Sequence, residues 1–169
     1  VDGFHVLTAG HCIYSHDHGG WATSIQVIPG YDNGYMPYYL AYNTNLRSYT
    51  GWTNSQMMEH DWGFITLDRN VGNFVGWMGR NTTTDMSFYE NLFNAMGYPA
   101  DLDYGQRMYY DADYGCQAND LRHWYQIDTY NGQSGMPVYW YDGSNRYIYT
   151  VHAYGEWDVS DCNSGTRLN

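Results

Sequence analysis

The 169-residue sequence has no lysine, only four prolines, and no apolar run near the length of about 18 residues that a membrane-spanning helix requires. All seven basic residues are arginines, against 18 acidic residues, which gives a formal net charge of −11. A surface with this charge repels phosphate backbones and anionic lipids. We therefore expect neither nucleic-acid nor membrane partners. Charged residues make up only 15% of the chain, below the usual quarter or so.

Polar and aromatic residues take the place of the missing charges, with 20 Tyr, 7 Trp and 19 Gly. This composition favours strands and turns over long helices, which are rich in Ala, Leu, Glu and Lys. We expect the aromatic side chains to pack within β-structure rather than to form a carbohydrate platform. With 43% apolar residues, the chain can build the core of one ordinary domain or of two small barrels.

Short strand-like runs follow one another along the chain, separated by Gly, Asn, Asp and Pro, without helical periodicity or internal repeats. The expected strands are 4–9, 24–28, 63–67, 92–96, 106–110, 124–127, 137–141 and 146–152. In the strand 63–67, apolar residues occupy both the odd and the even positions, which point to opposite faces of a strand. This pattern predicts burial on both faces. Many short strands at modest spacing favour a barrel or a sandwich. The weakly patterned segment 79–85 is the candidate crossover between two halves.

The three cysteines are Cys12, Cys116 and Cys162, an odd number. One interpretation pairs Cys116 with Cys162, and Cys12 with a cysteine upstream of Val1. The alternative is three reduced, buried thiols. The chain begins within a strand-like run and has no signal-peptide pattern, so we expect its native start upstream of Val1.

Three local patterns contain groups that can act together in catalysis. A strand-like run ends on a histidine in LTAGHC (7–12), an aspartate precedes an apolar strand in HDWGFI (60–65), and a serine lies in a glycine-flanked turn in DTYNGQSGMPV (128–138). A serine hydroxyl is a weak nucleophile until a base takes its proton. His11 can be that base, and Asp61 can orient its ring and stabilise the imidazolium. We predict that His11, Asp61 and Ser134 form a catalytic triad.

The glycines beside Ser134 and the order of the three patterns support this prediction. Gly132 and Gly135 permit a tight turn, so the backbone N–H groups of Gly132 and Ser134 can converge to form an oxyanion hole. Each pattern alone has a structural explanation, such as a capping aspartate or a chance G-x-S-G. In the order His, Asp, Ser they match a chymotrypsin-type triad. Their spacing places His11 and Asp61 in one half of the chain and Ser134 in the other.

The sequence resembles the glutamyl endopeptidase group of bacterial chymotrypsin-like serine proteases, the relatives of staphylococcal V8 protease and of the Bacillus enzymes. The matching motifs run through nearly the whole chain: TAGHC around His11, HDWGFITLD around Asp61, MGYPAD at 96–101, IDTYNGQSGMPVY around Ser134 and VHAYG around His152. The resemblance implies an all-β fold of two antiparallel six-stranded Greek-key barrels, the first incomplete at its N-terminal side. Residues 1–80 would form the N-terminal barrel with His11 and Asp61. Residues 81–169 would form the C-terminal barrel with Ser134 and the S1 pocket.

The resemblance also implies a function. The protein would be a secreted, extracellular and monomeric serine endopeptidase, without cofactor or metal, that cleaves protein or peptide substrates after Glu and less readily after Asp. The family residues that line the S1 pocket match His152 and Thr129. These two side chains can donate hydrogen bonds to a substrate carboxylate without a Lys or Arg. The backbone of Val151, Ala153 and Tyr154 would pair with an extended substrate.

The sequence departs from the family pattern at Met136, where a small residue is more usual. Met136 could reshape the floor beside Ser134 or only pack. Some family members also use the α-amino group of the mature N-terminus in substrate recognition, and we do not expect Val1 to be that terminus.

Other interpretations stay open beside the acid-specific protease. One is a catalytically silent homologue that binds proteins or glycans, and another is a serine protease with a different P1 preference. We interpret His16-Asp17-His18, with His5 nearby, as an exposed loop rather than a zinc site. We interpret 32–34, Asp-Asn-Gly, as a turn, because the remaining ligands of a calcium loop are missing.

Overall fold

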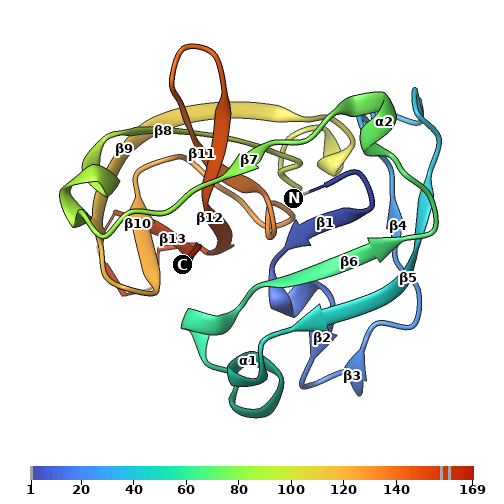
Figure 1. Cartoon of the computed structure of the whole chain (residues 1–169), viewed down its shortest axis with the longest axis horizontal. Helices are drawn as coiled ribbons and strands as arrows, with labels where there is room; N and C mark the ends of the chain where they lie inside the picture. The colour runs from blue at the N-terminus through green and yellow to red at the C-terminus, as the bar shows by residue number, and fades with distance from the viewer. Residues whose placement is uncertain (1, 157, 160) are drawn as a thin grey trace.

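The chain forms two large β-sheets that lie beside one another (Figure 1) and a two-stranded sheet. The computed structural model describes residues 2–156, 158–159 and 161–169. The strands of the first half are β1 (His5–Thr8), β2 (Tyr14–Ser15), β3 (Gly20–Trp21), β4 (Gln26–Val27), β5 (Ala41–Ser48) and β6 (Gly63–Leu67). The strands of the second half are β7 (Gly79–Arg80), β8 (Leu92–Gly97), β9 (Tyr109–Ala118), β10 (Arg122–Tyr125), β11 (Pro137–Tyr141), β12 (Arg146–Tyr154) and β13 (Asn163–Arg167).

Helical segments are short, as the composition predicts. They are α1 (Thr50–Ser55), α2 (Gly72–Val75) and the 3-10 turns η1 (Gly10–Cys12), η2 (Met58–His60), η3 (Met86–Glu90) and η4 (Asp103–Gly105). Within the described ranges, none of these helices has the length and apolar character needed to cross a membrane.

The second half of the chain is a closed barrel of six antiparallel strands. The strand order is β11-β8-β9-β10-β13-β12, and β11 also pairs with β12, which closes the ring. The short strand β7 adds to β12 in parallel, outside this ring. The structure therefore confirms the expected C-terminal barrel.

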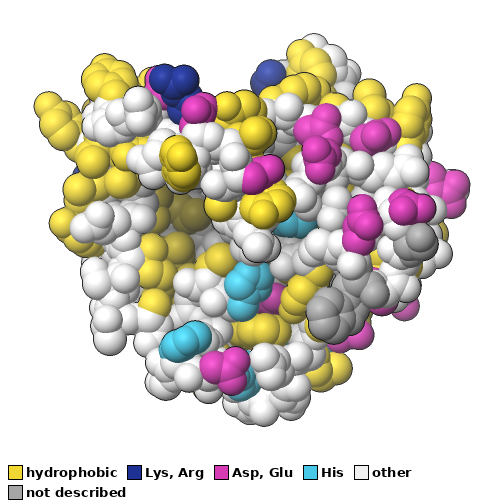
Figure 2. Space-filling view, turned by 180° about the vertical axis from the view of Figure 1, so that it is seen from behind, with side chains coloured by type: hydrophobic (Ala, Val, Ile, Leu, Met, Phe, Trp, Pro, Cys, Tyr) yellow, Lys and Arg dark blue, Asp and Glu magenta, His cyan; other side chains and the backbone are white. Residues whose placement is uncertain are grey.

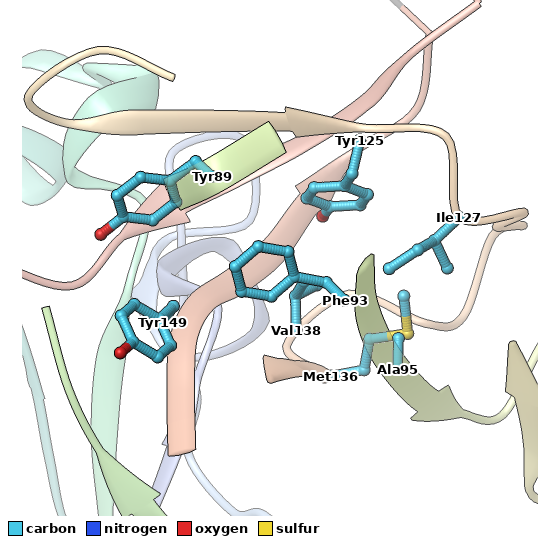
Figure 3. Packing of buried hydrophobic residues seen from close by; sticks show 8 residues of the cluster. All are labelled: Tyr89, Phe93, Ala95, Tyr125, Ile127, Met136, Val138 and Tyr149. Atoms are coloured by element: carbon cyan, nitrogen blue, oxygen red, sulfur yellow. The ribbon is translucent and has the colours of Figure 1, made fainter. Parts of the chain in front are cut away.

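Aromatic side chains fill the interior of this barrel (Figure 3). The buried cluster comprises Tyr89, Phe93, Ala95, Tyr125, Ile127, Met136, Val138 and Tyr149. Met136, which is 6% exposed, belongs to this cluster. Its side chain packs in the core beneath the serine loop, and burial of a methionine contributes about 1.5–3 kcal/mol.

The first half forms an open, curled sheet in the order β1-β6-β5-β4, with the hairpin β2–β3 beside it. Its buried core comprises Ile13, Ala41, Ile65, Leu67 and Val71. The sheet is a half-barrel, in agreement with the incomplete first barrel expected above. The strand β6 is fully buried on one face only, because Phe64 and Thr66 on its other face are half-buried. The prediction of burial on both faces is therefore wrong for this strand.

A disulfide joins Cys116 on β9 to Cys162, the residue before β13. This confirms the pairing of these two residues and excludes three reduced thiols. Cys12 has a free, exposed thiol in the described chain, and its pairing with a cysteine upstream of Val1 remains a prediction.

Candidate active site

Strand pairing in the first sheet brings His11 and Asp61 together. His11 lies in the 3-10 turn after β1, Asp61 lies just before β6, and β1 pairs with β6 so that Thr8 is opposite Gly63. The Asp61 Oδ2 atom lies 2.7 Å from His11 Nδ1, and Oδ1 accepts the His11 backbone N–H at 2.7 Å. Because an ionised carboxylate only accepts hydrogen bonds, Nδ1 of His11 bears the proton. The other nitrogen, Nε2, is then free to accept a proton.

The Asp61 carboxylate has no exposed surface, so protein groups must stabilise its charge. Besides the two groups of His11, the Tyr154 hydroxyl donates to Oδ2 at 2.6 Å. Burial disfavours the charged form of His11, but the hydrogen bonds to Asp61 and Cys12 outweigh it. The pKa of His11 is therefore raised above its ordinary value.

The backbone around this pair leaves no space for larger residues. A Cβ atom at Gly10 would lie 2.8 Å from Trp52 Cδ1 and 2.9 Å from Asp61 Oδ1. The second barrel also contacts the Asp61 turn, because the Thr166 hydroxyl on β13 lies 3.2 Å from the Asp61 backbone carbonyl. The His11–Asp61 pair is thus fixed by both halves of the chain.

The loop before β11 contains Ser134 between two glycines with positive φ, +100° at Gly132 and +89° at Gly135. Few residues other than glycine adopt this conformation. A Cβ at Gly132 would lie 2.8 Å from the Tyr98 carbonyl, and Ala100 N–H donates to the Asn131 carbonyl at 2.8 Å. The segment 96–101, which stood out only as a family motif, therefore supports the serine loop.

The serine loop also contacts the strand that leads to His11. A Cβ at Gly135 would lie 2.3 Å from the Thr8 hydroxyl, and Cys12 Sγ lies 3.6 Å from the Ser134 carbonyl. The half-buried Ser134 and His11 thus lie on adjoining segments of the two sheets. Among the described residues no hydrogen bond joins the Ser134 hydroxyl to His11, so the complete triad remains a prediction.

A hollow borders His11 on the side of the first sheet. It has a volume of about 270 Å³, and its lining includes Cys12, Tyr14, His18 and Trp21. Figure 2 shows histidine side chains (cyan) near the middle of one face, where the surface is hollowed. Acidic side chains are frequent on the same face, as the net charge requires.

His152 lies directly behind the serine turn. Its backbone carbonyl accepts from Gly135 N–H at 2.8 Å, and its N–H donates to the Met136 carbonyl at 3.1 Å. The ring is 4% exposed, and Nδ1 lies 2.7 Å from the Tyr125 hydroxyl. Burial, together with the nearby charge of His11, lowers the pKa of His152 to about 4. The ring is therefore a neutral hydrogen-bonding group at neutral pH.

Thr129, the second predicted S1 residue, borders a different hollow of about 220 Å³. Its lining includes Asp101, Asp111 and Asp128, and His152 is not part of it. The joint S1 pocket of Thr129 and His152 therefore remains a prediction.

The backbone of β12 is only partly available to a substrate. Val151 has strand partners on both sides, Pro137 on β11 and Thr166 on β13. Its expected pairing with a substrate is therefore wrong. Ala153 and Tyr154 have no partner on β11, and their pairing with a substrate remains a prediction.

The histidines of the loop 16–18 have hydrogen-bond partners within the protein. In the part of the chain that the structure describes, no group of three His, Cys, Asp or Glu side chains is placed to hold a metal ion. His16 Nε2 lies 2.8 Å from the Trp52 carbonyl, whereas His18 Nδ1 lies 2.9 Å from the Ser15 hydroxyl. Residues 32–34 form a turn, with Asp32 bridged to Tyr35.

Sequence reasoning missed two side chains of the site, the Tyr154 and Thr166 hydroxyls. Both hydroxyls reach the Asp61 segment from the second barrel. Neither residue has a spacing or motif that points to Asp61, because the contacts depend on how the two sheets pack. A tyrosine two residues after a predicted pocket histidine was the nearest signal.

Comparison with known proteins supports a protease relationship, although no family model matches the sequence. The chain is 38% identical over 164 residues to the extracellular metalloprotease of Bacillus subtilis and 32% identical over 168 residues to the glutamyl endopeptidase of Bacillus licheniformis. Both alignments cover 96% of this chain, but 51% and 52% of those proteins. The chain thus spans about half the length of these curated relatives.

Solved structures show the same fold. A Glu endopeptidase in complex with MPD superposes with a TM-score of 0.88 at 24% identity, covering 99% of this chain and 76% of that one. The protease Anisep from Arthrobacter nicotinovorans gives a TM-score of 0.82 at 24% identity, with coverage of 99% and 78%. The architecture therefore places the chain in the class of proteins with the chymotrypsin-like fold. Within this class, the chain is a homologue of glutamyl endopeptidase.

Proposed function

We propose that the protein is a secreted, extracellular serine endopeptidase that hydrolyses peptide bonds after Glu, and less readily after Asp. The main support is the buried Asp61 carboxylate, which accepts hydrogen bonds from both the backbone and the ring of His11. This geometry fixes the tautomer that a general base needs. In the proposal, residues 1–80 and 81–169 are the two halves of the enzyme. It acts as a monomer on protein or peptide substrates.

In the proposed reaction, His11 Nε2 takes the proton of the Ser134 hydroxyl while the oxygen attacks the substrate carbonyl carbon. The oxyanion accepts hydrogen bonds from the N–H groups of Gly132 and Ser134, each worth about 10²–10³ in rate. The imidazolium, stabilised by Asp61, returns the proton to the leaving amine, and an acyl-enzyme remains. In the second half of the reaction, His11 takes a proton from water, and the water oxygen attacks the acyl-enzyme carbonyl. The acid product and the free Ser134 hydroxyl are then released.

The preference for an acidic P1 side chain is proposed from His152. A hydroxyl proton donated by Tyr125 to Nδ1 would leave Nε2–H of His152 as a donor. A neutral donor can hold a carboxylate by hydrogen bonding where no arginine is near. The Thr129 hydroxyl would add a second donor.

A second candidate is the same chemistry with a different P1 preference. The observation that favours it is the hollow beside Thr129, whose lining contains three carboxylates. Negative charges there oppose an acidic substrate side chain and favour a basic or polar one. Cleavage of a peptide library that varies only P1 separates the two candidates.

Active-site labelling tests the protease itself. We expect a fluorophosphonate probe to label the wild type and Ser144→Ala, which changes an exposed serine in the β11–β12 hairpin, but not Ser134→Ala. Loss of labelling in Ser134→Ala alone would identify the nucleophile. A wild type that neither labels nor cleaves any peptide would instead favour the catalytically silent homologue.

A further inference from the structure

The Tyr154 hydroxyl links the second barrel to the buried carboxylate of the first sheet. Tyr154 ends β12, Asp61 precedes β6, and the hydroxyl lies 2.6 Å from Asp61 Oδ2. This carboxylate oxygen, Asp61 Oδ2, is also 2.7 Å from His11 Nδ1. Because the carboxylate only accepts, the tyrosine must donate, and a donor to a charged oxygen at this distance makes a strong hydrogen bond. Two donors from different sheets therefore share one oxygen.

A change of register in β12 accounts for the direction of this side chain. The pairing with β13 shifts between His152 and Tyr154, and such a bulge re-aims the side chains that follow it. The His152 ring contacts Tyr125 inside the second barrel, whereas the Tyr154 hydroxyl reaches the first sheet.

The Tyr154 ring is held in place by its own barrel. The Arg122 guanidinium lies 5.7 Å from the centre of this ring and 4.7 Å from that of Trp124. Arg122, which is 5% exposed, is fixed by bonds to Ser164 at 2.6 Å and to Asp158 at 2.5 Å. A cation between two aromatic rings restrains both of them. The hydroxyl is thus positioned before any substrate binds.

The hydroxyl of Tyr154 keeps its proton at neutral pH and well above it. Burial and the Asp61 charge raise the pKa of Tyr154 far above its ordinary value. The other titratable groups that act on His11 and Tyr154 are Cys12, His152, Arg122 and Glu59. They are common to all variants below, so a difference between variants reports on the hydroxyl alone.

We propose that Tyr154 is a positioning residue, whose hydroxyl holds the Asp61 carboxylate and thereby sets the orientation and basicity of His11. The proposal rests on the proposed function, because the orientation of His11 matters only if His11 is the base. It assigns to the Tyr154 side chain a role distinct from backbone pairing with a substrate.

The test compares the wild type with Tyr154→Phe, which removes the hydroxyl and keeps the ring. Without this donor the Asp61 charge is less compensated and binds the His11 proton more tightly. We expect the His11 pKa, measured by NMR titration of its ring signals, to rise by about one pH unit. For peptide hydrolysis, we expect kcat to fall about 10-fold with little change in KM.

Site-specific 3-fluorotyrosine at position 154 provides a second variant that keeps the hydroxyl and the fold. Its more acidic hydroxyl is a stronger donor, so the His11 pKa should shift downward, opposite to the shift in Tyr154→Phe. The matched control is Tyr141→Phe, which removes a hydroxyl bonded at 2.7 Å to the Gly143 carbonyl in a distant hairpin. It should leave the titration and kcat unchanged.

The outcomes separate the two proposals. An unchanged His11 titration in both Tyr154 variants overturns the positioning role, whether or not the wild type is active. A wild type without peptidase activity overturns the proposed function instead, because the titration does not depend on turnover. Opposite shifts in the two variants, with a reduced kcat in Tyr154→Phe, would support the positioning role.

Discussion

Inside the second barrel, Nε2 of His123 donates a hydrogen bond to the backbone carbonyl of Tyr89 at 2.9 Å. Because a carbonyl only accepts, Nδ1 is unprotonated and accepts from the Thr150 hydroxyl at 3.0 Å. A second proton would break this bond and place a charge where the ring has no exposed surface. Burial, aided by the positive charge of Arg167, therefore lowers the pKa of His123 to about 3.

Two such buried histidines predict an acid-sensitive fold. The pKa values of His123 and His152 are about 3 and 4 in the folded state, below the ordinary 6.5, so the unfolded chain binds their protons first. The free energy of unfolding should fall as pH drops below about 6.5, by several kcal/mol at pH 4. Urea denaturation at pH 7, 5.5 and 4 measures this. His123→Gln, which cannot titrate, should show a weaker pH dependence, and an equal dependence would contradict the assignment.

The His11–Asp61 pair predicts the acid limb of the pH–rate profile. Since the pKa of His11 is raised, the base is deprotonated only above the usual histidine range, and kcat/KM should rise with a midpoint above about 6.5. Asp61→Asn removes the charge that raises this pKa, so the midpoint should move to lower pH. Turnover should also fall about 10⁴-fold. An unmoved midpoint in Asp61→Asn would show that another group sets the profile.

His152→Ala should impair peptides with P1 Glu selectively. A hydrogen bond to a charged group is worth about 1.5–3 kcal/mol, which corresponds to a loss of roughly 10- to 100-fold in kcat/KM. Acylation by a fluorophosphonate probe should change little, because the probe presents no acidic side chain. Kinetics on paired Glu and Gln peptides give the measurement. Equal losses with both peptides and the probe would indicate a structural role for His152.

Gly135→Ala should weaken the contact between the serine loop and the first sheet. The new Cβ would lie 2.3 Å from the Thr8 hydroxyl, at a φ of +89°. Gly143→Ala is the matched control, because its φ is +95° but its Cβ would meet nothing within 4 Å. The backbone strain common to both costs about 1–2 kcal/mol, and the contact should add about 1–3 kcal/mol for Gly135 alone. Equal losses of stability in chemical denaturation would argue against a close contact.

The disulfide should contribute strongly to stability. Cys116 and Cys162 are 46 residues apart, and closing a loop of that length stabilises a fold by about 4 kcal/mol in the chain-entropy model. The double variant Cys116→Ser, Cys162→Ser should show this loss in urea denaturation. Cys12→Ser serves as the control and should leave the stability near that of the wild type.

Apolar strands could be predicted from the sequence, and polar ones could not. The expected segments 63–67 and 137–141 coincide with β6 and β11, because their apolar residues face a core. The central strand β13, with the sequence NSGTR, was missed although every residue in it is buried. Several of its polar groups have partners, as in the bonds of the Arg167 terminal nitrogens to the Asn119 and Thr83 carbonyls. The strand β5 was missed because its residues are mostly polar, and α1 and α2 because they are shorter than two helical turns.

The candidate site also has features that the sequence predicts and features that it does not. Local motifs were enough to predict the neighbourhood of His11 and Asp61, because each residue lies at the end of a recognisable strand. The pairing state of Val151 depends on which strands flank β12, and the contact of Tyr154 with Asp61 depends on a bulge and on sheet packing. Tyr154 and Asp61 are 93 residues apart, and the pairing of Val151 involves three strands at once, so no short window along the chain detects these relationships.

The covalent link between Cys116 and Cys162 spans the exposed hairpin 142–145 and also encloses Ser134 and His152. An exposed hairpin tip is where proteases most readily nick a polypeptide. A cut in this hairpin would leave two fragments that stay joined by the disulfide and separate only after a reductant is added. The barrel strands on either side of the cut would then stay paired, so a clipped molecule could outlast the damage.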